Sequence, residues 1–189
     1  MPLVEIVAGS ESDLQTVKDS GMLDVLDQVL VNLTSPWRVS VISAHRNDAE
    51  LTIFCKAAIS NDTRVFIGIA GMAAALPGAI SSKVNAKIAE DFGIHTRISA
   101  TVIGVALASS DMPNGMDALL SMTRMPPGIP VLCAGIGKAG CKNAAIAACY
   151  ILDQLVGTEL RSFLQKQSGK KPAKIDIMAS SILTPRGKE

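Results

Sequence analysis

The chain has 189 residues, of which 48% are hydrophobic and 19% charged, with a formal net charge of +1. This length and apolar content predict one globular domain, residues 1–166, and exclude a disordered chain. The near-zero net charge and 3% of aromatic residues argue against a nucleic-acid partner, and the longest apolar run, residues 144–152, is well short of the ~20 residues that a membrane-spanning helix needs.

The N-terminal sequence MPLVEIVAGS places Glu5 inside its apolar stretch and lacks the basic start of a signal peptide, so we expect a cytoplasmic protein. The four cysteines show no metal-ligand spacing, and we expect neither a metal nor a cofactor. We interpret them as small buried hydrophobic residues, with a reactive thiol as the alternative. They are Cys55, Cys133, Cys141 and Cys149.

The first two predicted units each consist of a strand, a turn and a helix. Residues 3–7 form a short apolar run before the turn AGSESD, and apolar residues then recur at helical spacing over residues 14–33, with a possible break at Ser20-Gly21. Ser12 and Gln15 have the spacing of a capping box, which predicts that this helix starts there. Residues 39–42 predict a second strand, followed by the turn SAHRND and a helix from Asn47 to about residue 58.

The pattern continues through three further strands. Residues 64–69 predict the third strand, and a helix-like stretch reaches about residue 90, which Pro77 should interrupt or start. Strands over 101–107 and 129–134 then alternate with helices over 116–122 and 142–166. Five nearly continuous apolar strands alternating with helices predict an α/β fold, a doubly wound five-stranded parallel sheet with helices on both faces.

Residues 167–189 form a basic C-terminal tail, beginning QSGKKPAK. It is either flexible or docks on a neighbouring subunit through its apolar residues 175–183.

The carboxyl ends of the first three strands carry the polar loops in which parallel sheets bind ligands. In the loop of residues 9–13, Ser10 and Ser12 could bind a phosphate at a helix N-terminus, and Asp13 could accept hydrogen bonds from ribose hydroxyls. The alternative is that Ser12 only caps the helix and Asp13 only complements its dipole.

The second loop, residues 43–48, contains the adjacent pair His45-Arg46. Histidine changes its protonation near neutral pH, whereas arginine is a permanent cation that binds phosphate through two parallel hydrogen bonds. The pair therefore suggests proton transfer beside an anion site, the alternative being a capping histidine next to a surface arginine. His95, in the polar run GIHTR, is interpreted as a surface or hydrogen-bonded histidine.

Residues 135–140 read G-x-G-x-x-G, a pattern that suggests a dinucleotide site and an NAD-dependent oxidoreductase. The motif follows the last predicted strand, so no later strand remains to present the acidic residue that binds the ribose; Glu159 falls inside a predicted helix. Close packing of strand against helix is the better explanation of these glycines.

Several motifs together resemble one known family. GSESD, SAHR and AGMAAALPG follow the first three strands, and MDALLSMTRMPPGIPV and GIGKAGCKNAAIAA come later. In this order, over residues 4–155, they resemble the PurE family of purine biosynthesis.

The resemblance implies a flavodoxin-like three-layer fold, a homo-octamer and a ribonucleotide substrate handled without metal or cofactor. The expected reaction moves a carboxylate from the exocyclic nitrogen of an aminoimidazole ribonucleotide to ring carbon 4, with His45 as general acid/base. The resemblance gives Ser10, Asp13 and Arg46 to phosphate and ribose, and places Ser43 and the segment with Gly71, Met72, Ala73 and Leu76 around the base.

The chain also departs from the family pattern. Ala75 stands where mutase-type members carry histidine, and Asn47-Asp48 replaces the usual Thr-Pro. The regions 19–34 and 84–99, and the tail, are longer than usual. A carboxylase that uses CO2 directly, and a non-catalytic or different-substrate nucleotide-binding relative, are therefore the alternatives.

Overall fold

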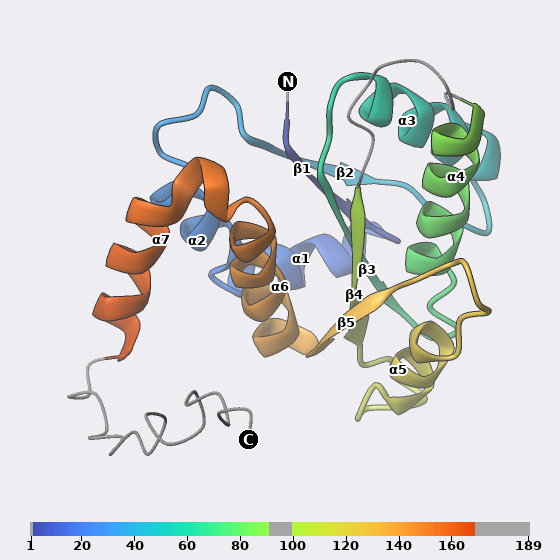
Figure 1. The fold of residues 1–189 in the computed structure, drawn as a ribbon. Coiled ribbons are helices and arrows are strands. Elements are labelled where there is room, and N and C mark those ends of the chain that lie inside the picture. The colour runs from blue at the N-terminus through green and yellow to red at the C-terminus, as the bar shows by residue number, and fades with distance from the viewer. Residues whose placement is uncertain (1, 91–99, 169–189) are drawn as a thin grey trace, which may run out of the picture.

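Five parallel strands form one sheet in the order β2-β1-β3-β4-β5 (Figure 1). The computed structural model describes residues 2–90 and 100–168. The strands are β1 (Val4–Ala8), β2 (Trp37–Val41), β3 (Val65–Gly71), β4 (Thr101–Leu107) and β5 (Leu132–Ile136). This order is that of flavodoxin-like folds and reverses between β1 and β3, so the predicted fold class is confirmed.

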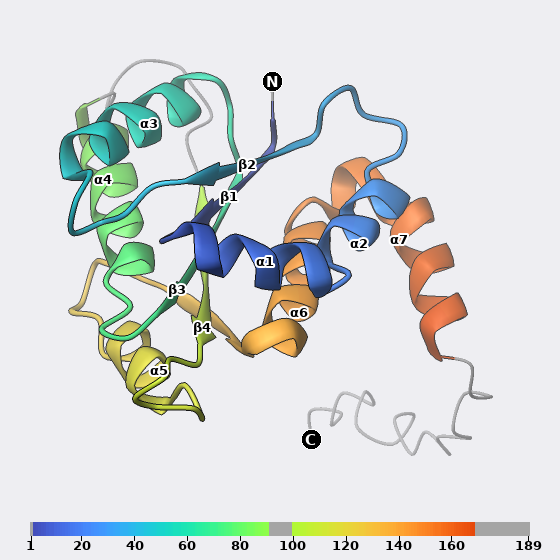
Figure 2. The ribbon, with the colours of Figure 1, turned by 180° about the vertical axis from the view of Figure 1, so that it is seen from behind.

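Seven helices in the described residues cover both faces of the sheet. In both ribbon views, α1 (Glu11–Asp19), α2 (Met22–Val29), α6 (Gly137–Ile151) and α7 (Asp153–Ser168) lie on one side. On the other side lie α3 (Asp48–Ser60), α4 (Leu76–Glu90) and α5 (Met116–Thr123) (Figure 2). No helix within residues 2–90 and 100–168 is long and apolar enough to cross a membrane.

The alternation of side chains along the strands builds two cores. Val4 and Ile6 of β1 join the core under α2, α6 and α7, whereas Val7 joins the core under α3, α4 and α5. The central strands β1, β3 and β4 are almost wholly buried, while the edge strands β2 and β5 are partly exposed. Strands with helices on both faces and a neighbour on each side are therefore the most buried.

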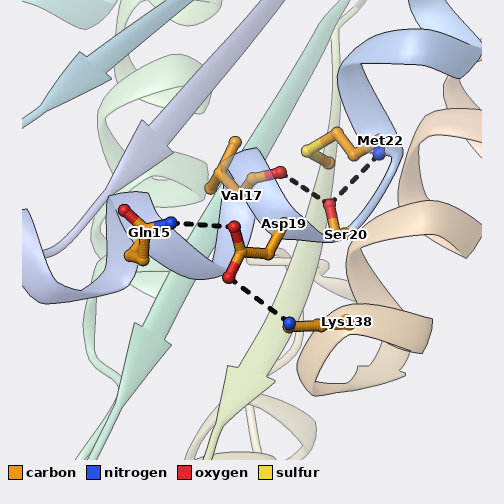
Figure 3. A network of polar contacts seen from close by, with 6 residues as sticks. All are labelled: Gln15, Val17, Asp19, Ser20, Met22 and Lys138. Carbon is orange, nitrogen blue, oxygen red and sulfur yellow. Dashed lines mark hydrogen bonds and ion pairs between the residues drawn. The ribbon is translucent and has the colours of Figure 1, made fainter.

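The predicted break at Ser20-Gly21 is confirmed, and polar contacts hold the junction in place (Figure 3). Ser20 Oγ donates to the Val17 carbonyl at 2.7 Å and accepts from the Met22 N–H at 3.1 Å, and Gly21 adopts a left-handed φ of +72°. Asp19 accepts from Gln15 at 2.8 Å and pairs with Lys138 of α6 at 3.3 Å. The helix therefore ends because a left-handed residue redirects the chain.

Several predicted boundaries are wrong. Ser10, not Ser12, caps α1. The last strand begins at Leu132 rather than residue 129, because Pro130 has no amide to give to a strand ladder. The predicted helix 142–166 starts earlier, at Gly137, and consists of two helices, because α6 ends at its cap residue, Leu152. The second helix, α7, is kinked at Val156 (φ −137°) and packs on α2 and α6.

The cysteine prediction holds for three residues and fails for one. Cys55, Cys141 and Cys149 are buried free thiols, whereas Cys133 is exposed on the edge strand β5. An edge strand has no neighbour on its outer side, which the apolar run around Cys133 could not reveal. Helix α7 continues through Ser168, and the rest of the predicted tail, residues 169–189, lies outside the described residues.

Candidate active site

A cavity of about 690 Å³ opens at the carboxyl ends of the strands, between the loops that follow β1, β2, β3 and β4. All ten residues predicted for the site line it: Ser10, Ser12, Asp13, Ser43, His45, Arg46, Gly71, Met72, Ala73 and Leu76. The strand-order reversal between β1 and β3 explains this position, because the loops diverge there to opposite faces of the sheet and leave a crevice.

The first loop provides a helix N-terminus and two hydroxyl groups. Ser10 has extended backbone geometry, and its Oγ accepts from the Asp13 N–H at 3.3 Å and lies 2.8 Å from the Ser12 Oγ. A Cβ at Gly9 would lie 3.3 Å from the Asp13 carboxylate, so glycine gives this carboxylate room beside the strand end. Free N–H groups and hydroxyls here suit a bound anion.

Asp13 places a half-buried carboxylate in the same cavity. Burial raises the pKa of Asp13, and hydrogen bonds from Ser10 oppose that rise. Because a carboxylate repels a phosphate but accepts well from hydroxyl groups, Asp13 suits the ribose part of a ligand.

The second loop presents the imidazole and the guanidinium. His45 and Arg46 are exposed, and Arg46 Nε donates to Ser43 Oγ at 3.4 Å. The backbone turns here because the Asn47 N–H donates to the Ser43 carbonyl at 2.9 Å, and Asn47 starts α3 without a side-chain capping bond. The helix therefore starts where the sequence predicts, although the Asn47 side chain does not cap it.

The third loop is a wall of small residues that ends at Leu76, where α4 begins. Pro77 stands in the first turn of α4, so it starts the helix rather than interrupting it. A Cβ at Gly68 would lie 3.1 Å from Pro77, which shows how closely α4 approaches β3. Ala75 also lines the cavity and contributes only a methyl group there.

Sequence reasoning missed the loop after β4. Ala108, Ser109 and Ser110 line the cavity, and Ser109 Oγ accepts from the Met112 N–H at 3.1 Å. The signal was present, because these residues follow the fourth predicted strand as the other loops follow the first three. The same strand-end rule nominates them.

The glycine motif 135–140 lies outside the residues that line this cavity. A Cβ at Gly140 would lie 2.6 Å from the backbone of Gly135, and Lys138 pairs with Asp19. The packing interpretation of this motif therefore holds. His95 lies outside the described residues.

The cavity combines groups that suit a phosphorylated ligand with one group able to move a proton. Hydroxyls, backbone N–H groups and a guanidinium bind anions, and an imidazole is the common general acid/base. Within residues 2–90 and 100–168, no cluster of three histidine, cysteine or acidic side chains could hold a metal ion.

The chain is similar in sequence to proteins of one known family. The family model described as AIR carboxylase matches residues 3–90 and 93–173. The chain is 36% identical over 168 residues to N5-carboxyaminoimidazole ribonucleotide mutase from Haemophilus influenzae, covering 87% of this chain and 90% of the relative. It is 38% identical over 151 residues to the mutase of the same name from Bacillus subtilis, covering 80% of each.

A solved structure shares the fold. The crystal structure of Treponema denticola PurE superposes with a TM-score of 0.69 at 22% identity, covering 89% of this chain and 92% of that one.

Proposed function

The chain belongs to the AIR carboxylase family, as its loop motifs predicted, and from this membership we propose that it interconverts carboxylated aminoimidazole ribonucleotides in purine biosynthesis. The observation that carries the proposal is the meeting of His45 and Arg46 with the N-terminus of α1 in one cavity. A ribonucleotide has an anionic end and a base that must exchange a proton, and this cavity has a group for each.

The phosphate binds at the N-terminus of α1, held by Ser10, Ser12 and Arg46, and Asp13 accepts from the ribose. The base then lies against Ser43 and the wall from Gly71 to Leu76. This placement follows from charge. The guanidinium, hydroxyls and N–H groups lie in the loops after β1 and β2, whereas the apolar wall lies in the loop after β3.

His45 moves the proton. As the bond between the exocyclic nitrogen and the carboxylate breaks, His45 donates a proton to that nitrogen and CO2 is released. Carbon 4 of the ring then attacks the CO2, and the proton on carbon 4 returns to His45. The reaction is therefore an isomerisation with no net gain or loss of protons or electrons. Walls of small apolar residues limit escape of CO2.

The alternative is a carboxylase that takes CO2 directly and releases the proton of carbon 4. The observation in its favour is Ala75, which leaves the cavity without the histidine that mutase-type members carry there. A bicarbonate requirement separates the two reactions, because only the carboxylase consumes CO2.

The test is turnover of synthetic ribonucleotides by the purified protein, with and without bicarbonate. We expect the carbamate to be converted without bicarbonate, and His45→Asn to lower kcat by about 10²–10⁴-fold while leaving KM nearly unchanged, because the imidazole transfers the proton rather than holding the ligand. Thermal melting confirms that the variant is folded. Binding of the nucleotide without turnover by the wild type would contradict the proposal and favour a non-catalytic relative.

We also propose a cytoplasmic homo-oligomer, an octamer. Exposed apolar side chains support self-association: Leu120 of α5 is 53% exposed and Leu132 of β5 55% exposed. These lie on adjacent elements, at an edge of the sheet where β5 has no further strand within the described residues.

A further inference from the structure

Met72 has a backbone conformation that its side chain disfavours. Its φ is +55°, in the left-handed region, where the Cβ of an L residue crowds its own backbone. The Ala74 N–H donates to the Gly71 carbonyl at 3.1 Å, so Met72 is the second residue of a β-turn between β3 and α4. Turns with a positive φ at the second residue alone favour glycine there.

Packing does not compensate for this strain. The Met72 side chain is 62% exposed and belongs to neither hydrophobic core. Among the described residues, the other positive-φ residues besides glycine are Ser35 and Asp62. Both have short polar side chains, and aspartate in particular tolerates this region, so Met72 is the long apolar residue of the three.

The position of the strained residue suggests what the side chain does. Met72 lines the cavity directly after β3, at the start of the wall of alanines that we assign to the base. Strained residues that persist near a binding site are commonly part of its function. A methionine thioether is flexible and makes favourable contacts with aromatic rings.

We propose that Met72 is a specificity-determining residue whose side chain covers the aromatic base of the bound ribonucleotide. This inference rests on the proposed function. The Met72 side chain is exposed to water in the free protein and becomes covered when the base binds beneath it. Burial of this apolar surface strengthens the binding of the ribonucleotide. The contact with the base offsets the cost of the strained backbone at Met72.

The inference predicts opposite effects on stability and on binding from one substitution. Met72→Gly relieves the strain and removes a mostly exposed side chain, so we expect a rise in Tm of about 2–4 °C. The same variant loses the cover on the base, so we expect KM for the carboxylated ribonucleotide to rise about tenfold with kcat within about twofold.

Two further variants separate the effect of backbone strain at Met72 from the effect of its side chain covering the base. Met72→Ala keeps the strained backbone and loses the cover, so KM should rise about tenfold with no rise in Tm. Met72→Leu keeps an apolar cover of similar size and should retain a KM within about threefold of the wild type. Ser35→Gly is the matched control: it relieves a positive φ away from the cavity and should raise Tm without changing KM.

Inhibition by ribose 5-phosphate, which lacks a base, locates the contact. Its inhibition constant should be the same, within about twofold, in the wild type and in Met72→Gly, because the phosphate and ribose bind at other loops. An equal loss of affinity for ribose 5-phosphate would overturn the proposal, since the variant would then have disturbed the whole cavity.

The outcomes distinguish this inference from the function on which it rests. If the wild type turns over the ribonucleotide and both Met72→Gly and Met72→Ala keep its KM, the proposed role of Met72 is wrong and the proposed function is retained. If the wild type neither binds nor converts the ribonucleotide, both are wrong.

Discussion

Glu5 is a carboxylate in the middle of a buried strand. Its side chain is fully buried, and Arg38, its register partner on β2, donates to both carboxylate oxygens at 2.7 and 3.0 Å. Burial raises the pKa of Glu5 above its ordinary value of 4.5, and the hydrogen bonds and charge of Arg38 oppose the rise. Burial of the Glu5 carboxylate therefore affects its pKa more than the pairing with Arg38 does.

This balance makes stability depend on pH in a definite direction. A carboxyl whose pKa is raised by folding contributes stability that is present below its unfolded pKa, about 4.5, and lost as pH rises through the raised folded value. Glu5→Gln does not titrate, so the free energy of unfolding of the wild type minus that of Glu5→Gln should decrease as pH rises from 4 to 7.

Urea unfolding at several pH values measures this difference. If the difference instead increased with pH, the Arg38 pair would outweigh burial. Arg38 is half exposed, so water hydrates its guanidinium in the variant and no buried charge is left unpaired.

At the scale of single elements, two glycines in consecutive helices have different roles. Gly140 lets α6 approach β5, because a Cβ there would lie 2.6 Å from the Gly135 carbonyl carbon and 2.7 Å from its oxygen. In α7, a Cβ at Gly157 would meet only the side chain of Asp153, at 3.1 Å, which can move aside. The first glycine is required by packing and the second is not.

The same substitution should therefore have opposite effects at the two sites. Gly140→Ala should lower the free energy of unfolding by about 2–3 kcal/mol, because backbone atoms must separate. Gly157→Ala should raise it by about 0.5–1 kcal/mol, because alanine restricts the unfolded chain and favours the helix. Urea unfolding checks both, and stabilisation by Gly140→Ala would show that α6 is free to shift.

For the molecule as a whole, the exposed edge of the sheet offers a test of assembly. In an octamer, the mass by analytical ultracentrifugation should be eight times 19.7 kDa. Leu132→Asp should produce smaller species, because a charge on the exposed edge strand opposes association, and its Tm in the dissociated state reports whether the fold survives. An unchanged mass in Leu132→Asp would exclude β5 from the interface.

Cysteine reactivity gives a second measurement of the same surface. Burial raises the pKa of Cys55 and Cys149 to about 12 and that of Cys141 to about 11, so these thiols should stay unreactive at pH 8. Cys133 is next to Leu132 and exposed in the single chain. The proposed octamer therefore predicts that a thiol reagent modifies Cys133 faster in Leu132→Asp than in the wild type.

Local patterns of residues were enough to predict the fold class and most of the cavity. Apolar runs such as 65–69 and 101–107 are local signals of buried parallel strands, and the loops after such strands meet at one end of the sheet. The positions of Ser10, His45 and Arg46 in one cavity followed from that rule. The loop after the fourth strand obeys the same rule, although Ser109 and Ser110 were not among the predicted site residues.

Features that depend on contacts between distant segments could not be predicted from local patterns. Cys133 is exposed because no strand lies beside β5 in the described sheet. Whether Ser10 or Ser12 caps α1 depends on where β1 ends. The left-handed φ of Met72 arises because β3 must turn into α4 within a few residues. Such features are set by neighbours in space, which a local pattern of residues does not record.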